Sequence, residues 1–150
     1  MSYTLAAFIG KEPIVEAAAA MTGQHRVSRL AYSLHMLELS SSPMSEGRFS
    51  EQFYFLTPQL ASVAAIISTM GDIGYIEAEF FGGEGSQACM VWREGDVVFG
   101  PFREDDEDPP VAPLRDWPIN RALRFFGIRV DAHLDEHMDE FRTVDLGRFR

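Results

Sequence analysis

Cysteine is almost absent from this chain of 150 residues, which contains only Cys89. A single cysteine excludes an intramolecular disulfide and is typical of proteins from a reducing compartment. The residue lies in the apolar stretch QACMVW and has no cationic neighbour in the sequence. These surroundings favour a buried structural thiol over a nucleophile. We therefore expect a cytoplasmic location.

Basic residues are also scarce. The chain has 13 Lys and Arg against 23 Asp and Glu, which gives a formal net charge of -10. Proteins that bind nucleic acid need a positive patch to contact the phosphates, so this function is disfavoured. An acidic protein attracts partners of the opposite sign. We expect a basic protein partner and no nucleic acid.

Long apolar runs are missing as well. The N-terminal stretch SYTLAAFIG is followed at once by Lys11, Glu12 and Pro13, and no basic residue precedes it. This pattern predicts neither a signal peptide nor a membrane span. A hydrophobic content of 46% and an aromatic content of 12% suit one globular domain over residues 1–150.

Periodicity in the first half of the chain predicts strands and helices in alternation. Apolar residues alternate over residues 3–9 and again over residues 29–40, which favours two strands. A proline near the start and an alanine run predict a helix over residues 12–21. The clearest helix is TPQLASVAAIISTMG, where Thr57 suits the N-cap and Gly71 suits the C-terminal end.

The second half begins with three stretches that alternate with a period of two, namely YIEAEFF, QACMVW and VVFGPF. The turn sequences GGEGS and REGD separate them, so we expect a three-stranded antiparallel meander. WPINRALRFFGI predicts a helix, and residues 131–141 predict another. The fold class is therefore α+β, a mostly antiparallel sheet with helices packed on one face.

The stretch HLDEH, from His133 to His137, fits the pattern H-x-x-E-H of one class of zinc peptidase. On a helix the two imidazoles lie one turn apart, and Glu136 could act as the base. Such sites need a further ligand from a later element, and only 13 residues follow His137. We interpret the stretch as an acidic terminal helix, and predict no metal site and no cofactor.

Acidic side chains are the candidate binding residues. Glu77 and Glu79 are two positions apart in a predicted strand, so they project from the same face. The pair could serve as an acid and a base, or as a platform for a basic partner. No complete catalytic set is found, so no catalytic residue is assigned. The predicted partner-binding residues are Glu77, Glu79, Glu84, Glu104, Asp105, Asp106, Glu107 and Asp108.

Three stretches, GYIEAEFFGGEGSQACMVW, INRALRFFGI and DEFRTVDLGRFR, resemble small bacterial proteins that act as immunity partners of secreted toxins. The resemblance covers about the second half of the chain and includes no catalytic motif. It implies a cytosolic protein that binds and blocks a cognate toxin without catalysis of its own. No functional residue is carried over from it.

The leading hypothesis is therefore an immunity-type inhibitor with an acidic binding surface. One alternative is a small enzyme or ligand-binding module with a cleft beside residues 74–102, lined by Tyr75, Glu77, Glu79 and Trp92. Another is a structural subunit of a phage or secretion assembly that self-associates. The sequence leaves open whether the chain forms a homodimer.

Overall fold

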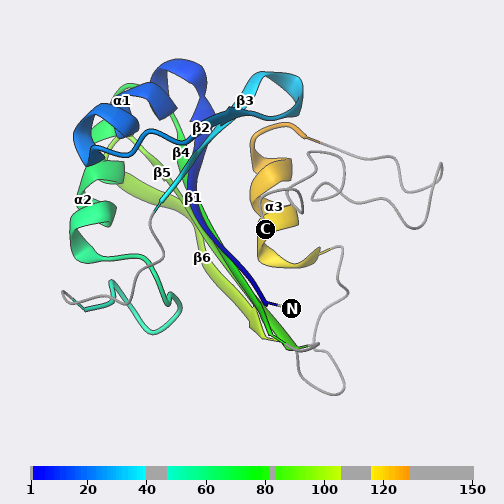
Figure 1. The fold of residues 1–150 in the computed structure, drawn as a ribbon. Coiled ribbons are helices and arrows are strands. Elements are labelled where there is room, and N and C mark those ends of the chain that lie inside the picture. The colour runs from blue at the N-terminus through cyan, green and yellow to red at the C-terminus, as the bar shows by residue number, and fades with distance from the viewer. Residues whose placement is uncertain (1, 40–46, 82–83, 106–115, 129–150) are drawn as a thin grey trace.

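The computed structural model describes residues 2–39, 47–81, 84–105 and 116–128. Within these ranges the chain forms a six-stranded antiparallel sheet in the order β2-β3-β1-β4-β5-β6, with helices on both faces (Figure 1). The elements are β1 (Ser2–Lys11), α1 (Glu12–Thr22), β2 (Val27–Arg29), the short 3₁₀ helix η1 (Ala31–Ser33), β3 (Leu34–Glu38), α2 (Pro58–Ile67), β4 (Ile73–Phe81), β5 (Glu84–Arg93), β6 (Asp96–Asp105) and α3 (Pro118–Phe125).

Strand β1 lies near the middle of the sheet, between β3 and β4. Phe8 points to one face and packs edge-on against Tyr75 of β4, with the ring centroids 5.9 Å apart. Leu5 and Ile9 point to the other face, and both are buried. A strand that is covered on both faces needs apolar side chains in both directions. This accounts for the almost uniformly apolar sequence of β1.

Helices α1 and α2 cover one face of the sheet (Figure 1). Thr57 accepts a hydrogen bond from the backbone N–H of Leu60 at 3.1 Å and caps α2, as the sequence predicts. The core of this face contains the following side chains of the two helices: Ile14, Val15, Ala18, Ala61, Ala64 and Ile67. They pack on the sheet residues of the same face, among them Phe8, Tyr75 and Met90.

Helix α3 lies on the opposite face (Figure 1). Its residues Ile119, Ala122 and Leu123 are buried in a second core cluster, which includes Cys89 of β5. Burial raises the pKa of the Cys89 thiol to about 12, so the thiol is held in its protonated form. The prediction that the helices pack on one face of the sheet holds for α1 and α2. Helix α3 packs its apolar side against the other face.

The α+β class and the antiparallel meander of β4, β5 and β6 are confirmed. The single strand expected over residues 29–40 is not formed. These residues contain the end of β2, a turn at η1 and the strand β3. The chain turns at η1, where Tyr32 and Ser33 have φ values of 57° and 66°. β3 then pairs antiparallel with β2, with Arg29 opposite His35. Alternating side chains could not reveal this turn, because neither residue is a glycine.

None of the helices in the described ranges is long and apolar enough to cross a membrane. The helix predicted over residues 131–141 lies outside the described residues, as does the acidic segment 106–115.

Candidate functional site

Glu77 is a buried carboxylate on the α1/α2 face of β4, and its side chain is only 3% exposed. Its oxygens accept hydrogen bonds from the backbone N–H groups of Tyr54 at 2.8 Å and Phe55 at 3.2 Å. The hydroxyl of Tyr75 donates a third at 3.0 Å. A buried carboxylate is tolerated only with such partners. Glu77, predicted as a partner-binding residue, is thus buried beneath the segment before α2, so its carboxylate is not exposed at the surface.

Burial and hydrogen bonding act on the pKa of Glu77 in opposite directions. Burial disfavours the charged form, while the two backbone N–H groups, the Tyr75 hydroxyl and the nearby Arg103 favour it. Burial is the larger effect, so the pKa of Glu77 lies above its ordinary value of 4.5. Burial and the neighbouring Glu77 raise the pKa of Tyr75 well above 10.0, which keeps its hydroxyl a donor.

Residues 47–57 form an ordered loop because two of their apolar side chains are anchored in the core. Phe53 and Leu56 are fully buried, and the Phe53 ring packs edge-on against Tyr75 at 5.6 Å between centroids. The backbone N–H of Phe49 donates to the carbonyl of Leu56 at 2.7 Å, which closes the loop. In the same loop, Phe49 and Tyr54 remain 42% and 40% exposed.

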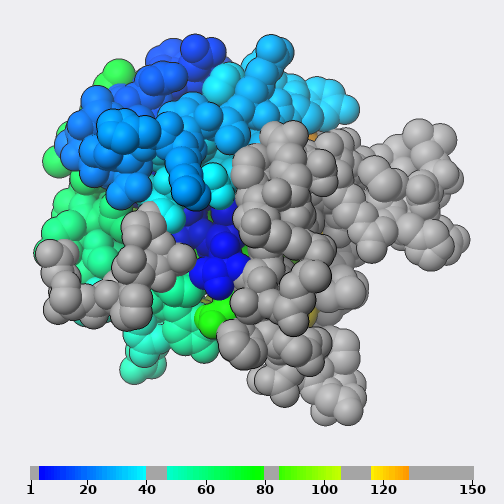
Figure 2. Space-filling view, viewed as in Figure 1, coloured from blue at the N-terminus to red at the C-terminus, as the bar shows by residue number. Residues whose placement is uncertain are grey.

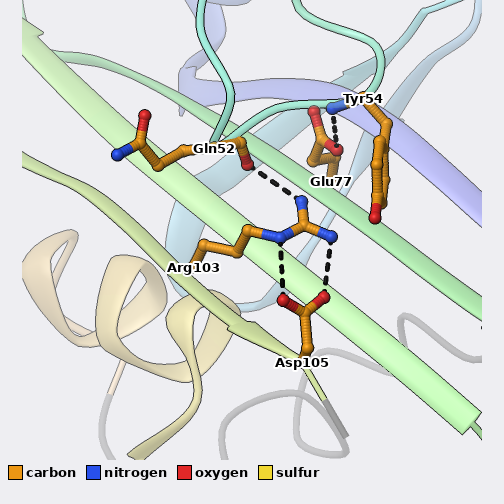
Figure 3. A network of polar contacts seen from close by, with 5 residues as sticks. All are labelled: Gln52, Tyr54, Glu77, Arg103 and Asp105. Carbon is orange, nitrogen blue, oxygen red and sulfur yellow. Dashed lines mark hydrogen bonds and ion pairs between the residues drawn. The ribbon is translucent and has the colours of Figure 1, made fainter.

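Arg103 of β6 ties this loop to the sheet (Figure 3). Its guanidinium donates to the backbone carbonyl of Gln52 at 3.0 Å and to both carboxylate oxygens of Asp105, at 3.2 and 2.8 Å. It also lies 4.1 Å from the centre of the Tyr54 ring. Planar guanidinium groups favour both the bidentate pairing and the stacking. Arg103 therefore fixes the position of an exposed aromatic residue.

The sheet register shows which acidic residues lie beside the loop. Glu79, Ser86 and Asp105 form one row across β4, β5 and β6, and the next row on the same face contains Glu77 and Arg103. Glu79 is half-buried and Asp105 is exposed. We define the loop surface as Arg48, Phe49, Gln52, Tyr54, Glu79 and Asp105.

The predicted acidic set is divided by the fold. Glu104 is paired with Gln87, whose side chain accepts a hydrogen bond from the backbone N–H of Ile119 in α3. Glu104 thus belongs to the opposite face from Glu79 and Asp105. Glu84 is the first residue of β5, and the remaining predicted residues, Asp106, Glu107 and Asp108, lie outside the described residues.

The contributions of Arg103 and Tyr54 were missed by the sequence interpretation. The loop and the sheet row that it contacts are far apart in the chain, so no spacing rule connects them. A weak signal was present in the aromatic stretch FYFL, which directly precedes the helix cap at Thr57 and follows a polar segment. Aromatic residues next to such a segment indicate that part of it is anchored in the core.

The proposed cleft beside residues 74–102 does not agree with the packing. Tyr75, Glu77 and Trp92 are buried in the sheet core and cannot line an open cleft. A cavity does occur elsewhere, next to Lys11, Arg29 and His35. The motif with His133 and His137 lies outside the described residues; within the described part, no three His, Cys, Asp or Glu side chains are placed to hold a metal ion.

Comparisons of the chain with protein-family models, with curated proteins and with solved structures gave no significant match.

Proposed function

We propose that this chain is a cytoplasmic immunity-type protein that neutralises a cognate bacterial toxin by binding it through the loop surface. The observation that carries the proposal is the fixed presentation of Tyr54, whose backbone N–H is held by buried Glu77 and whose ring contacts Arg103. The resemblance of the second half of the chain to immunity partners of secreted toxins supports the same function.

The residue types of the loop surface are those that contribute most to protein interfaces. Tyrosine and arginine are enriched among the residues that dominate binding energy, and phenylalanine is enriched at interface centres. Tyr54 lies near two guanidinium groups, those of Arg103 and of Arg48, the latter 5.5 Å from the ring centre. Because the loop is already ordered, binding costs less conformational entropy than it would for a mobile segment.

The net charge of the chain supports a basic partner. A charge of -10 favours encounter with a positively charged protein, such as a toxin whose active site accepts polyanions. Glu79 is the unpaired acidic candidate on the loop surface, since no ion pair is found for it among the described residues. Asp105 is already paired with Arg103 at 2.8 Å, so it contributes less to the field.

The test uses a candidate toxin domain, one encoded by an open reading frame that neighbours the gene of this protein. Its affinity for the wild-type protein and for Tyr54→Ala is measured by calorimetry. We expect Tyr54→Ala to weaken binding by about thirtyfold, the loss typical of a central aromatic contact. The matched control is Tyr32→Ala, which removes a tyrosine that is 72% exposed and does not belong to the loop surface. If both variants bind like the wild type, the loop surface is not the interface.

The acidic part of the proposal has its own test. Glu79→Lys is compared with Asp96→Lys, which makes the same charge change at the opposite end of the meander. We expect Glu79→Lys to slow association and weaken binding by about tenfold or more, and Asp96→Lys to have a smaller effect. Glu104→Lys tests the other face of the sheet. Equal affinity of all three variants and the wild type would contradict an acidic binding surface.

A further inference from the structure

Helix α2 carries no charged residue, although 24% of the chain is Asp, Glu, Lys or Arg. Helices α1 and α3 do carry charges, namely Glu12 and Glu16 in the first and Arg121 and Arg124 in the second. The exposed side of a helix in a globular protein normally presents charged and polar residues to water. The exposed side of α2 departs from this pattern.

The exposed side chains of α2 form one stripe. Gln59, Ser62 and Ile66 are spaced by three and four residues, and Met70 continues the series in the turn after the helix. Residues with this spacing lie on one side of a helix. Ile66 is 59% exposed and Met70 is 66% exposed, so the stripe ends in two large apolar side chains that contact water. We call these four residues the helix face.

The helix face begins where the loop surface ends. Tyr54 precedes the N-cap residue Thr57 by three positions, and the ten residues of α2 extend the surface by roughly 15 Å. Figure 1 shows residues 47–57 leading directly into α2, and in Figure 2 both contribute to the teal and green surface on the left of the molecule. The loop and the helix thus cover the same face of the sheet, one next to the other.

The far end of the helix face is held in place by Ser68. Its hydroxyl accepts a hydrogen bond from the backbone N–H of Gly95 at 2.8 Å, and its carbonyl accepts one from that of Glu94 at 3.0 Å. These bonds tie the β5–β6 turn to the end of α2. Val97 of β6 is paired with the buried Trp92, so it points to the α2 side, and it is 42% exposed. The apolar end of the helix face therefore has a rigid support and a further exposed apolar residue on the same side of the sheet.

The loop surface alone is small for a stable complex. It has six residues, whereas stable interfaces use about 20–30 residues on each partner. The centres of such interfaces are depleted in charged residues and enriched in Met, and their rims are polar. The helix face supplies an uncharged surface of this kind. Among the described residues, charges flank its far end, where Asp72 pairs with Arg93 and Glu94 is exposed.

We propose that the helix face is a second part of the toxin-binding interface, and that the toxin domain places an uncharged, apolar region on Ile66 and Met70. This inference rests on the proposed function. The toxin domain then combines a basic region, which contacts the loop surface, with an apolar region beside it. Covering an uncharged face removes apolar surface from water without the cost of desolvating a charge.

The double variant Ile66→Gln with Met70→Gln removes both apolar groups and leaves the net charge unchanged. Glutamine is a better helix former than isoleucine and both positions are exposed, so we expect the variant to fold, which thermal unfolding checks. Its affinity for the candidate toxin domain should fall by about tenfold. The loss should be the same at low and high salt, because no charge is removed.

Met21→Gln is the matched control. It makes the same substitution at a methionine that is 49% exposed near the end of α1 and lies outside the helix face. We expect this variant to bind like the wild type. An equal loss of affinity in Met21→Gln and the double variant would overturn the inference.

The methyl groups of the wild-type protein give a readout that needs no variant. On addition of the toxin domain, the NMR signals of the Ile66 δ-methyl and the Met70 ε-methyl should shift, and that of the Met21 ε-methyl should not. Unchanged Ile66 and Met70 signals would overturn the inference. So would shifts of these signals with the concentration of this protein alone, because a second copy would then occupy the helix face.

Failure of this inference differs from failure of the proposed function. If Tyr54→Ala weakens binding but the double variant binds like the wild type, the toxin contacts the loop surface and not the helix face. If the wild-type protein does not bind the toxin domain at all, the proposed function fails and the inference falls with it.

Discussion

Glu77 joins two parts of the chain that no local pattern connects. Its carboxylate holds the backbone of residues 54 and 55, and the same two peptide groups would otherwise need other partners. Burial of Glu77 lowers the stability of the fold, because it disfavours the charged form of the carboxyl group. The benefit is a loop with a defined shape, which presents Tyr54 at the surface.

The raised pKa of Glu77 predicts a specific pH dependence of stability. The folded protein binds this proton more tightly than the unfolded chain, in which the carboxyl titrates near 4.5. The stability from this site is therefore fully present below that pH and is lost as the pH rises through the folded pKa. The loss is about 1.4 kcal/mol for each unit by which the pKa is raised.

Urea unfolding of the wild type and Glu77→Gln, from about pH 4 to about pH 8, measures this effect. The variant lacks only this titrating group. The contributions of all other acidic residues to the pH dependence are the same in both proteins, so they cancel in the difference. We expect the stability advantage of the wild type over the variant to shrink with rising pH. An advantage that grows with pH would mean that hydrogen bonding outweighs burial at Glu77.

Arg103→Lys tests the second attachment of the loop. Lysine cannot form the bidentate pair with Asp105 while also reaching the carbonyl of Gln52. We expect a loss in the free energy of unfolding on the order of 1 kcal/mol, limited by the solvent exposure of Asp105. Amide exchange in residues 52–56 should become faster.

The control for this prediction is Arg93→Lys. Arg93 makes a bidentate pair of the same kind with Asp72, at 2.9 and 2.8 Å, but it does not contact the loop. We expect a smaller loss of stability and unchanged exchange in residues 52–56. If both variants change exchange in the loop equally, Arg103 has no special role in holding it.

At the scale of elements, the sequence predicts structures whose signals are local. Thr57 and Pro58 mark the start of α2, and alternation with turn sequences marks β4, β5 and β6. The relations between elements were harder to predict. The period of two correctly predicts that Glu77 and Glu79 lie on the same face of the sheet. It does not predict that a loop more than twenty residues earlier in the chain covers only Glu77.

The position of α3 illustrates the same limit. WPINRALRFFGI was correctly predicted to form a helix, and Ile119, Ala122 and Leu123 on its apolar side are buried. The face of the sheet on which α3 packs depends on which face α1 and α2 already cover. An amphipathic pattern carries no information on this choice.

Gly74→Ala tests the packing between β4 and the end of α3. A Cβ atom at Gly74 would lie 2.8 Å from Cε2 of Phe126 and 2.9 Å from Cγ1 of Ile9. We expect a loss of roughly 1–3 kcal/mol in the free energy of unfolding, measured in urea. Gly71→Ala is the control, since its Cβ would meet only the flexible end of Ile14 at 3.0 Å. Equal stability of Gly74→Ala and the wild type would show that this contact can relax.

At the scale of the whole molecule, association through the sheet depends on its edge strands, which in the described part of the chain are the short β2 and the longer β6. Pro101 of β6 lacks a backbone N–H, and the pairing of β6 with β5 is irregular on both sides of Val91 in β5. Both features disfavour edge-to-edge association. We expect light scattering to give the monomer mass of 16.9 kDa. Twice that mass would favour the alternative of a self-associating structural subunit.

The central claim is that the loop surface binds a toxin, and hydrogen exchange of the complex tests it most directly. The wild-type protein is compared with and without a candidate toxin domain from a neighbouring open reading frame, so no substitution disturbs the fold. We predict that amides in residues 48–56 and at the end of β6, near Asp105, become protected. Unchanged exchange in these segments, with protection elsewhere or nowhere, would contradict the claim.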